Sequence, residues 1–250
     1  MKLIDSHAHL SDLNEIEKVV ERAKGVGVSA IIAVGANLRT CISTLGLSED
    51  FPKYVYPALG IHPTEWYAED VEESLRFVEE RIDSCIAVGE IGLDYWNKEA
   101  RKSEAVQEKQ REIYVRQLRM ARENGKPVSI HGRGAWSDAL KLAKEEEIAK
   151  AVFHWYSGPL DVLQPLLDSG YLISATPAAE FSRDHRAALV KAPLDRILIE
   201  TDSPVGYHGV PSEPADLVRT LKALAELKEV SIEEAAQVTT LNSEKFFDLS

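Results

Sequence analysis

Residues that can bind metal ions begin almost at the start of the chain, in the stretch "LIDSHAHL". Asp5, His7 and His9 are spaced two residues apart, and side chains alternate faces along a β-strand, so the three would share one face. Imidazole and carboxylate groups together suit divalent metals such as Zn, Mn, Fe, Co or Ni. One histidine alone would more often be structural, but this spacing indicates a candidate metal site.

Further ionisable residues follow other short apolar runs. They are His62 in "GIHP", Glu90 in "GEIGLDYW", His131 in "IHGRG", His154 in "FHWYSG" and Asp202 in "ETDSP". If these runs are the strands of a barrel, their carboxyl ends meet at one face, where such barrels carry their active sites. Five of the seven histidines fall at such ends. His185 is the one that we expect on an exposed helix face.

The predicted ligand set is larger than one catalytic ion needs. It contains four imidazoles and two carboxylates, from His7, His9, Glu90, His131, His154 and Asp202. A catalytic zinc usually takes three protein ligands, so two divalent ions (Zn, Mn or Mg), about 3.5–4 Å apart and bridged by a carboxylate, fit better. Some barrels use a modified lysine as the bridge, but Lys126 precedes its strand, at the opposite end of the barrel. Glu90 is the bridge that we expect.

The elements that must position these residues alternate along the whole chain. Nearly continuous runs of Val, Ile, Leu and Ala are typical of parallel strands buried on both faces. The expected strands are 2–6, 30–34, 55–60, 85–90, 128–131, 151–154, 172–175 and 196–201. The expected helices are 13–24, 39–47, 71–81, 104–124, 135–147, 160–167, 183–190 and 214–227. A capping box at Ser231 predicts a further helix, with a last one near 242–248.

Eight strand–helix units in 250 residues predict an α/β protein with a single (β/α)8 TIM barrel and extra C-terminal helices. A doubly wound open sheet is the alternative, because it shows the same alternation. The sequence has no internal repeat, low-complexity tract or Gly/Ser linker. We therefore expect one domain over residues 1–250, a metal-dependent hydrolase barrel.

Composition excludes several classes of protein. The net charge of −12 argues against a broad basic surface for duplex DNA, although bound cations would still admit an anionic substrate to one cleft. No apolar run approaches the roughly 18 residues of a membrane span, and no signal-peptide pattern opens the chain. Cys41 and Cys85 have no metal-type spacing. We expect a cytoplasmic protein without membrane association, and the sequence leaves its oligomeric state open, a monomer included.

In their order, the blocks "DSHAHL", "GIHP", "GEIGLDYW", "PVSIHGRG", "HWYSG" and "ETDSP" resemble the signatures of the TatD family of metal-dependent deoxyribonucleases, within the amidohydrolase superfamily. The resemblance spans nearly the whole chain. It implies two metal sites that share Glu90, one completed by His7, His9 and Asp202 and the other by His131 and His154. It also implies that His62 and Arg133 contact substrate phosphate. Without it, His62 could simply form a turn and Arg133 could pair with a loop acid.

Two segments depart from the family pattern. Where the family usually has HCFSG, this chain has "HWYSG", with Trp155 and Tyr156. After "ETDSP" the family often continues into a leucine-containing basic loop, whereas this chain continues "VGYHGVPSEP", with Tyr207 and His208. Both segments lie beside the expected mouth of the barrel, so they bear on substrate identity and not on the metal ligands.

The expected reaction is exonucleolytic hydrolysis of phosphodiester bonds at single-stranded DNA ends, by water that two divalent ions activate. Glu90 and Asp202 are the expected catalytic carboxylates. Asp202 would orient the water or accept its proton, and Arg133 would offset charge on phosphate oxygens. Hydrolysis of an ester or amide, such as an aminoacyl ester or a lactone, at the same site is the alternative. A non-catalytic barrel that binds a partner is a third possibility, against which the complete ligand set argues.

Several residues near the predicted ligands are expected to support the site and not to bind metal. Asp5 and Glu200 stand two residues before a ligand, so we expect them to hydrogen-bond to ligands. Asp94 either does the same or caps its loop. Four aromatic residues near strand ends either stack on bases or pack within the loops: Trp96, Trp136, Trp155 and Tyr156.

Overall fold

A computed structural model describes residues 1–67 and 70–249. Its strands are β1 (Leu3–Ala8), β2 (Val28–Val34), β3 (Val55–Leu59), β4 (Ala87–Gly92), β5 (Val128–His131), β6 (Ala151–Phe153), β7 (Leu172–Ala175), β8 (Ile197–Ile199), β9 (Gly206–Tyr207) and β10 (Val210–Pro211). Its helices are α1 (Ile16–Gly25), α2 (Leu38–Asp50), α3 (Val71–Glu80), α4 (Glu104–Glu123), α5 (Trp136–Glu145), α6 (Leu160–Asp168), α7 (Arg183–Lys191), α8 (Leu217–Lys228) and α9 (Ile232–Phe247). Short 3-10 turns join several of these elements.

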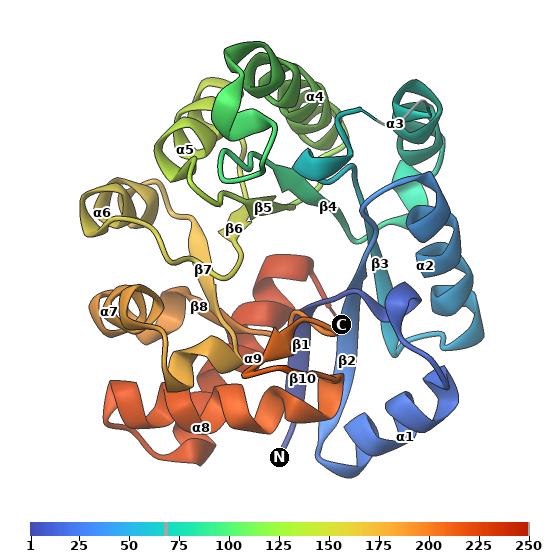
Figure 1. Cartoon of the computed structure of the whole chain (residues 1–250). Coiled ribbons are helices and arrows are strands. Elements are labelled where there is room, and N and C mark those ends of the chain that lie inside the picture. The colour runs from blue at the N-terminus through green and yellow to red at the C-terminus, as the bar shows by residue number, and fades with distance from the viewer. Residues whose placement is uncertain (68–69, 250) are drawn as a thin grey trace.

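The first eight strands form one parallel sheet in chain order, from β1 to β8. The helices lie around the strands as an outer ring (Figure 1). A doubly wound sheet would reverse its strand order at a switch point, and this order does not reverse. The prediction of a (β/α)8 barrel with extra C-terminal helices is confirmed.

The barrel closes between β8 and β1 through the segment that follows β8. The backbone N–H of Asp202 donates to the carbonyl of His7 at 3.0 Å, and the N–H of His9 donates to the carbonyl of Ser203 at 2.7 Å. The hydroxyl of Ser6 adds a bond to the carbonyl of Ile199 at 3.0 Å. Closing the barrel thus brings the predicted ligands of its first and last strands together.

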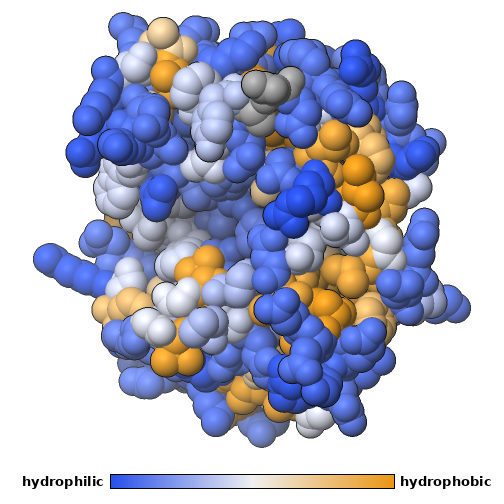
Figure 2. All heavy atoms as spheres, turned by 45° about the vertical axis from the view of Figure 1, so that its right-hand side comes forward, coloured by the Kyte–Doolittle hydropathy of each residue, from blue (hydrophilic) through white to orange (hydrophobic). Residues whose placement is uncertain are grey.

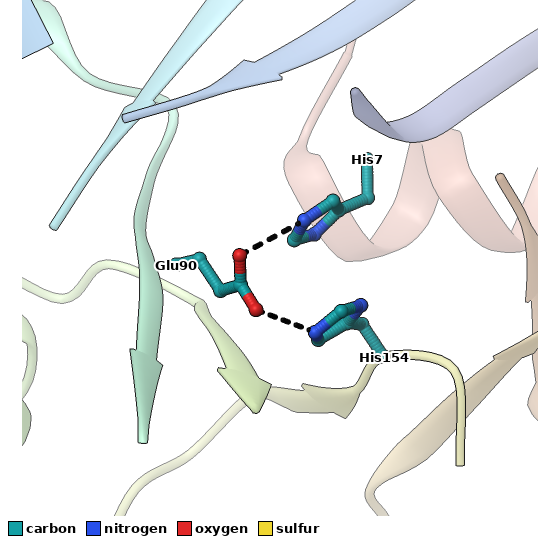
Figure 3. A group of neighbouring side chains, drawn as sticks. All are labelled: His7, Glu90 and His154. Carbon is teal, nitrogen blue, oxygen red and sulfur yellow. Dashed lines mark ion pairs between the residues drawn. The ribbon is translucent and has the colours of Figure 1, made fainter. Parts of the chain in front are cut away.

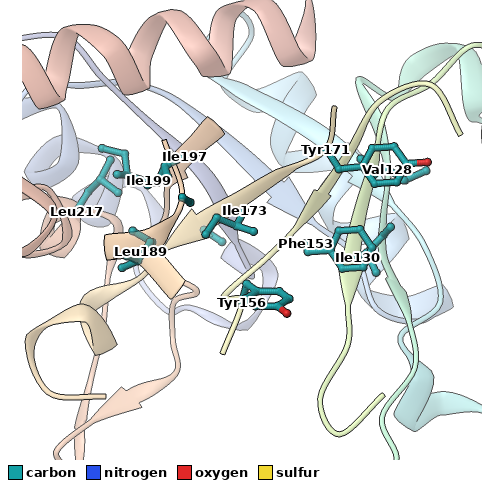
Figure 4. Packing of buried hydrophobic residues seen from close by; sticks show 14 of the residues in the cluster. Val128, Ile130, Phe153, Tyr156, Tyr171, Ile173, Leu189, Ile197, Ile199 and Leu217 are labelled. Carbon is teal, nitrogen blue, oxygen red and sulfur yellow. The ribbon is translucent and has the colours of Figure 1, made fainter. Parts of the chain in front are cut away.

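Alternation along the strands separates an apolar layer from a polar one. Val128 and Ile130 of β5 belong to the same buried cluster as Leu189 of α7 and Leu217 of α8 (Figure 4). Ser129, between them in sequence, is also buried, and its hydroxyl lies 3.2 Å from His7 Nδ1. Each fully buried large aliphatic side chain stabilises a fold by about 1.5–3 kcal/mol, so the apolar layer supports the barrel while the polar one serves the site.

Helix α9 covers the end of the barrel opposite to the predicted ligands. Its Phe246 and Phe247 pack in one buried cluster with Ile32 and Leu198 of the strands. The hydroxyl of Thr240 donates to the carbonyl of Lys2, just before β1, at 2.7 Å.

In the view of Figure 2 hydrophilic side chains cover most of the surface, with hydrophobic ones in separate patches. In the described ranges no helix combines the length and apolarity that crossing a membrane requires.

Most predicted elements are found, with shifted ends. The strands at 128–131 and 172–175 keep their bounds, whereas the fourth strand lies two residues later than predicted. The helices expected from residues 13 and 214 begin at Ile16 and Leu217, each after a 3-10 turn. The hairpin of β9 and β10 was not predicted. Its turn has positive φ at His208 (54°) and Gly209 (80°), and only the glycine signals this in the sequence.

The separate last helix near 242–248 is a wrong prediction. Ser231 caps α9 by accepting the N–H of Glu234 at 3.1 Å, and the helix then runs unbroken to Phe247. Asn and Ser side chains often cap helices, but Asn242 and Ser243 lie inside α9. Here the Asn242 amide donates to the carbonyls of Leu194 and Ile197, each at 2.9 Å, and the Ser243 hydroxyl donates to the carbonyl of Thr239. Neither side chain is available to cap.

Candidate metal centre

Glu90 of β4 turns its two carboxylate oxygens toward different groups of histidines. Oε2 lies 3.4 Å from His7 Nε2 and 3.2 Å from His9 Nε2. Oε1 lies 2.8 Å from His131 Nδ1 and 2.7 Å from His154 Nε2. Figure 3 shows the carboxylate between the rings of His7 and His154. We call His7, His9 and Asp202 site A, and His131 and His154 site B, with Glu90 shared by both.

Site A combines the end of β1 with the segment after β8. Asp202 Oδ1 lies 3.6 Å from Nε2 of both His7 and His9, and the three ligand atoms lie within 4.8 Å of one another. Site B combines β5 with the residue after β6, where His131 Nδ1 is 3.3 Å from His154 Nε2. The structure therefore brings all six predicted metal ligands together at the expected end of the barrel.

The second ring nitrogens of two predicted ligands have partners outside the centre. His154 Nδ1 lies 3.3 Å from Glu200 Oε1, a contact that holds a proton on Nδ1 and, when a cation replaces the proton on Nε2, leaves Nε2 as the ligand atom. His7 Nδ1 contacts the Ser129 hydroxyl, while its buried Nε2 has no hydrogen-bond partner among the described residues. Nitrogen lone pairs turned toward carboxylates repel them unless a cation lies between. The donor set therefore fits divalent metal ions.

The charges of the centre also favour cations. Burial opposes protonation of His9, but hydrogen bonding to Asp202 and Glu90 outweighs it and raises the pKa of His9 to about 10. Burial is likewise outweighed by the Glu90 carboxylate at His154, whose pKa is raised. Burial disfavours the charge of Glu90, yet the surrounding His62 and His154 hold its pKa well below its usual range. Protons and metal ions bind to the same nitrogen atoms. The negative charge that favours protonation of these histidines therefore also favours binding of a metal ion in place of the protons.

His62 reaches the same centre, with its Nε2 3.4 Å from Glu90 Oε1. Its Nδ1 accepts the backbone N–H of Thr64 at 3.2 Å. Burial lowers the pKa of His62 and favours the neutral ring. Its Nδ1 also lies 2.6 Å from the Thr64 hydroxyl, which can donate or accept, so this contact admits a proton on either ring nitrogen. A ring nitrogen of His62 lies within 4.8 Å of ligand atoms of Glu90 and His131, so these three residues form a further candidate group of metal ligands. The geometry suits a contact with substrate oxygen, which stays a prediction.

Arg133 pairs with a loop acid, the alternative that its sequence left open. Its Nε and Nη2 donate to both oxygens of Asp94, at 3.1 and 2.6 Å. Its side chain is 54% exposed and lines the cavity, so it is still accessible to a ligand. Asp94 has both of the roles considered for it, because it lies 3.5 Å from His131 Nε2 and also accepts the N–H of Trp96. Burial opposes ionisation of Asp94, but His131 and Arg133 lower its pKa.

The centre opens into a cavity of about 920 Å³. Both sites border it, and its wall also includes His62, Trp96, Arg133, Trp136 and Trp155. Two residues beside the centre have left-handed backbone, Trp155 (φ 42°) and Asp202 (φ 49°). Such strain in non-glycine residues collects at functional sites. Hydrogen bonds hold both in place, from Asp202 N–H to His7 and from Trp155 N–H to the Ser174 hydroxyl.

Three residues support the predicted ligands. Asp5 hydrogen-bonds to the ligand His7 as expected, by accepting its backbone N–H, and its carboxylate also accepts from the hydroxyl of Thr201 at 2.6 Å and from the backbone N–H of Thr201. Ser129 and Thr64, which hold His7 and His62, were not predicted. Ser129 could have been found, because it stands two residues before His131 on the same strand face.

The exposed position predicted for His185 is wrong. The side chain is fully buried, its Nδ1 donates to the carbonyl of Tyr156 at 2.7 Å, and its Nε2 accepts the N–H of Thr176 at 3.2 Å. Burial lowers its pKa to about 4. Ala188 and Leu189 are buried on the same helix, and their spacing of three and four residues from His185 is the signal that marks this face as internal.

Known proteins resemble this chain over nearly its whole length. The deoxyribonuclease TATDN3 of Homo sapiens is 31% identical over 98% of this chain and 94% of that protein. The uncharacterized metal-dependent hydrolase YcfH of Escherichia coli strain K12 is 32% identical over 100% of this chain and 97% of that protein. The crystal structure of YJJV, a TatD homologue from Escherichia coli, superposes with a TM-score of 0.88 at 29% identity, covering 99% of this chain and 98% of the other.

The family comparison covers the same span. The model of the family described as TatD related DNase matches residues 4–248, a range that includes every residue of sites A and B and their partners Ser129 and Glu200. The resemblance noted in the sequence blocks is thus confirmed by matches to whole chains and by the fold. The chain belongs to the TatD related DNase family.

Proposed function

We propose that the protein is a divalent-metal-dependent phosphodiesterase that removes nucleotides from single-stranded DNA ends, with one ion in site A and one in site B. The observation that carries the proposal is the position of Glu90, whose two oxygens face the two sites at 2.7–3.4 Å. A carboxylate between two histidine groups can contribute one oxygen to each of two neighbouring ions. A related protein of similar length is a deoxyribonuclease by name, which supports DNA as the substrate.

Bound at these sites, two divalent ions would supply Lewis acidity and an activated water for attack on phosphorus. Asp202 borders the cavity and accepts the proton of that water while the bond from phosphorus to the leaving oxygen breaks. The Nε2–H of His62 donates to a nonbridging phosphate oxygen, and Arg133 offsets the negative charge from the other side. Glu200 and Ser129 contact the Nδ1 atoms of His154 and His7 and so orient both rings with Nε2 toward the sites.

The shape and charge of the protein favour a single strand. The cavity of about 920 Å³ is in the size range of small-ligand sites, and a duplex would need a long basic surface instead. The net charge of −12 removes the nonspecific attraction on which duplex binding depends. The two free, buried cysteines agree with the proposed cytoplasmic location.

The test is a labelled single strand, a matched blunt duplex and a closed circular duplex, each incubated with purified protein and Mg, Mn or Zn in turn. The expected result is stepwise shortening of the single strand, faster than either duplex, and no cleavage after chelation. Glu90→Gln is the matched inactive control. Equal rates on closed circular duplex and single strand would contradict the proposed preference for ends.

A second set of substrates separates the alternatives. Hydrolysis of bis-p-nitrophenyl phosphate tests phosphodiester chemistry without a nucleic acid. Metal-loaded protein that leaves this compound and DNA intact but hydrolyses an aminoacyl ester or a lactone would favour the ester or amide function. Protein that takes up no metal would favour a non-catalytic barrel.

A further inference from the structure

We propose that a second pocket beside the catalytic cavity holds the base of the nucleotide next to the scissile phosphate, with Trp96 as its stacking surface. The proposal rests on the function proposed above and adds a residue that determines substrate binding. The pocket has a volume of about 730 Å³. It shares Trp96, Arg133, Trp136 and Ser157 with the catalytic cavity, so one ligand can occupy both.

Trp96 presents its indole to solvent from a fixed backbone. The residue is 68% exposed, although its backbone N–H is held by Asp94 Oδ1 at 3.0 Å. The ring lies against Gly134, where a side chain would collide with it, and Gly134 has a φ of 72° that favours glycine. An exposed aromatic ring that packs with one side against the backbone offers a flat surface on which a base can stack.

Trp136 forms a rigid wall between the pocket and the cavity. Its indole is so close to Gly132 and Gly158 that a side chain at either glycine would collide with it. Its ring centroid is 4.6 Å from that of Tyr156, whose hydroxyl donates to the carbonyl of Pro159 at 2.6 Å. Trp136 and Tyr156 therefore pack within the loops, and Trp96 is the aromatic residue of the pocket with its surface free.

The charges of the pocket suit a neutral base better than a second phosphate. Its wall contains Arg133 and Arg183 but also Asp138 and Asp184. The two arginines are balanced by the two aspartates, so the wall has no excess of positive charge that would attract a second phosphate. The remaining carboxylates and Arg183 are acceptors and donors that the polar edges of a base can use, while the phosphate stays at the metal centre.

The experiment uses six-nucleotide single strands that are intact or carry one abasic residue at each position in turn. Cleavage by metal-loaded wild type, Trp96→Ala, Trp96→Phe and Tyr67→Ala is compared. Tyr67 is the matched control, because it is 66% exposed and borders neither cavity. If wild type leaves the strands intact, their binding to the same proteins is measured by fluorescence anisotropy.

At one position, loss of the base should slow the wild type about tenfold, the order of one base–aromatic stack. Trp96→Ala should slow the intact strand by a similar factor but not slow that abasic strand further, because the partner of the indole is already gone. Trp96→Phe should keep most of the rate, and Tyr67→Ala should match wild type. The pocket proposal is overturned if Trp96→Ala slows intact and abasic strands equally, or if wild type tolerates an abasic residue everywhere.

The two proposals fail in different ways. Cleavage without this coupling would overturn the pocket and leave the nuclease function standing. Binding that shows the coupling, without cleavage, would overturn the nuclease function and leave the pocket standing. If the protein neither binds nor cleaves the strands, both proposals are overturned.

Discussion

His154 Nδ1 lies 3.3 Å from Glu200 Oε1, so that Nε2 is the ring nitrogen that faces Glu90 in the candidate metal centre. The same oxygen of Glu200 accepts the backbone N–H of Trp155 at 3.1 Å, so it orients the ring and the strained residue after it together. Glu200 is 1% exposed, and water cannot replace it. Glu200 is not part of the cavity wall, and it positions a predicted ligand of site B.

Glu200→Gln should weaken metal binding about 10- to 100-fold, because the amide lacks the charge and can present a donor to His154 Nδ1. Titration calorimetry of Mn or Zn into metal-free protein measures the effect. Glu226→Gln, the same change at an exposed position of α8, is the control and should bind like wild type. Unchanged affinity in Glu200→Gln would show that the contact is structural only.

Protein saturated with Zn or Mn and then freed of excess ion should hold about two ions per chain, because the ligands form two groups around one carboxylate. Glu90→Gln should hold clearly fewer, since it removes the ligand that both groups share. Elemental analysis gives both numbers. A wild type that saturates at one ion would refute the two-metal centre.

Asp202→Asn should lower kcat about 10²- to 10⁴-fold, because the amide keeps the shape and one coordinating oxygen but cannot accept a proton. Metal content should fall less than in Glu90→Gln, and the melting temperature should stay close to wild type, since the change lies at the catalytic mouth. Hydrolysis of bis-p-nitrophenyl phosphate at saturating metal measures the rate. A rate near wild type would mean that another group takes the proton.

His185 should make the folded protein less stable in acid. Burial lowers the pKa of His185 from 6.5 to about 4. Between about pH 6.5 and pH 4, His185 is therefore protonated in the unfolded chain but neutral in the folded chain. Stability is therefore full above pH 6.5 and is lost as pH falls through this window, by about 3 kcal/mol at most. His185→Gln lacks this titration.

Urea unfolding of wild type and His185→Gln between pH 7 and pH 4.5 measures the effect. Wild type should be the more stable protein at pH 7, and its advantage should shrink as the pH falls, while contributions from other groups cancel in the difference. A difference that stays constant over this range would contradict the buried neutral histidine.

The sequence by itself determined the barrel and the identity of the predicted ligands. Periodicity of apolar residues predicts strands locally, and the carboxyl ends of parallel strands share one face of a barrel. His7, His131 and Asp202 could therefore be assigned to one centre without coordinates. His185 shows the limit of this reasoning, since helical spacing marked its buried face but its polar side chain suggested the surface.

Only the tertiary structure decided how the residues of the centre meet. The direction of each Glu90 oxygen, the approach of His62 to Glu90 and the pairing of Arg133 with Asp94 all depend on partners from other loops or strands. The hydrogen bond from Asp202 to His7 joins residues at opposite ends of the chain. Local sequence cannot specify such contacts, because they exist only once the barrel has closed and excluded water from the polar groups that must then pair.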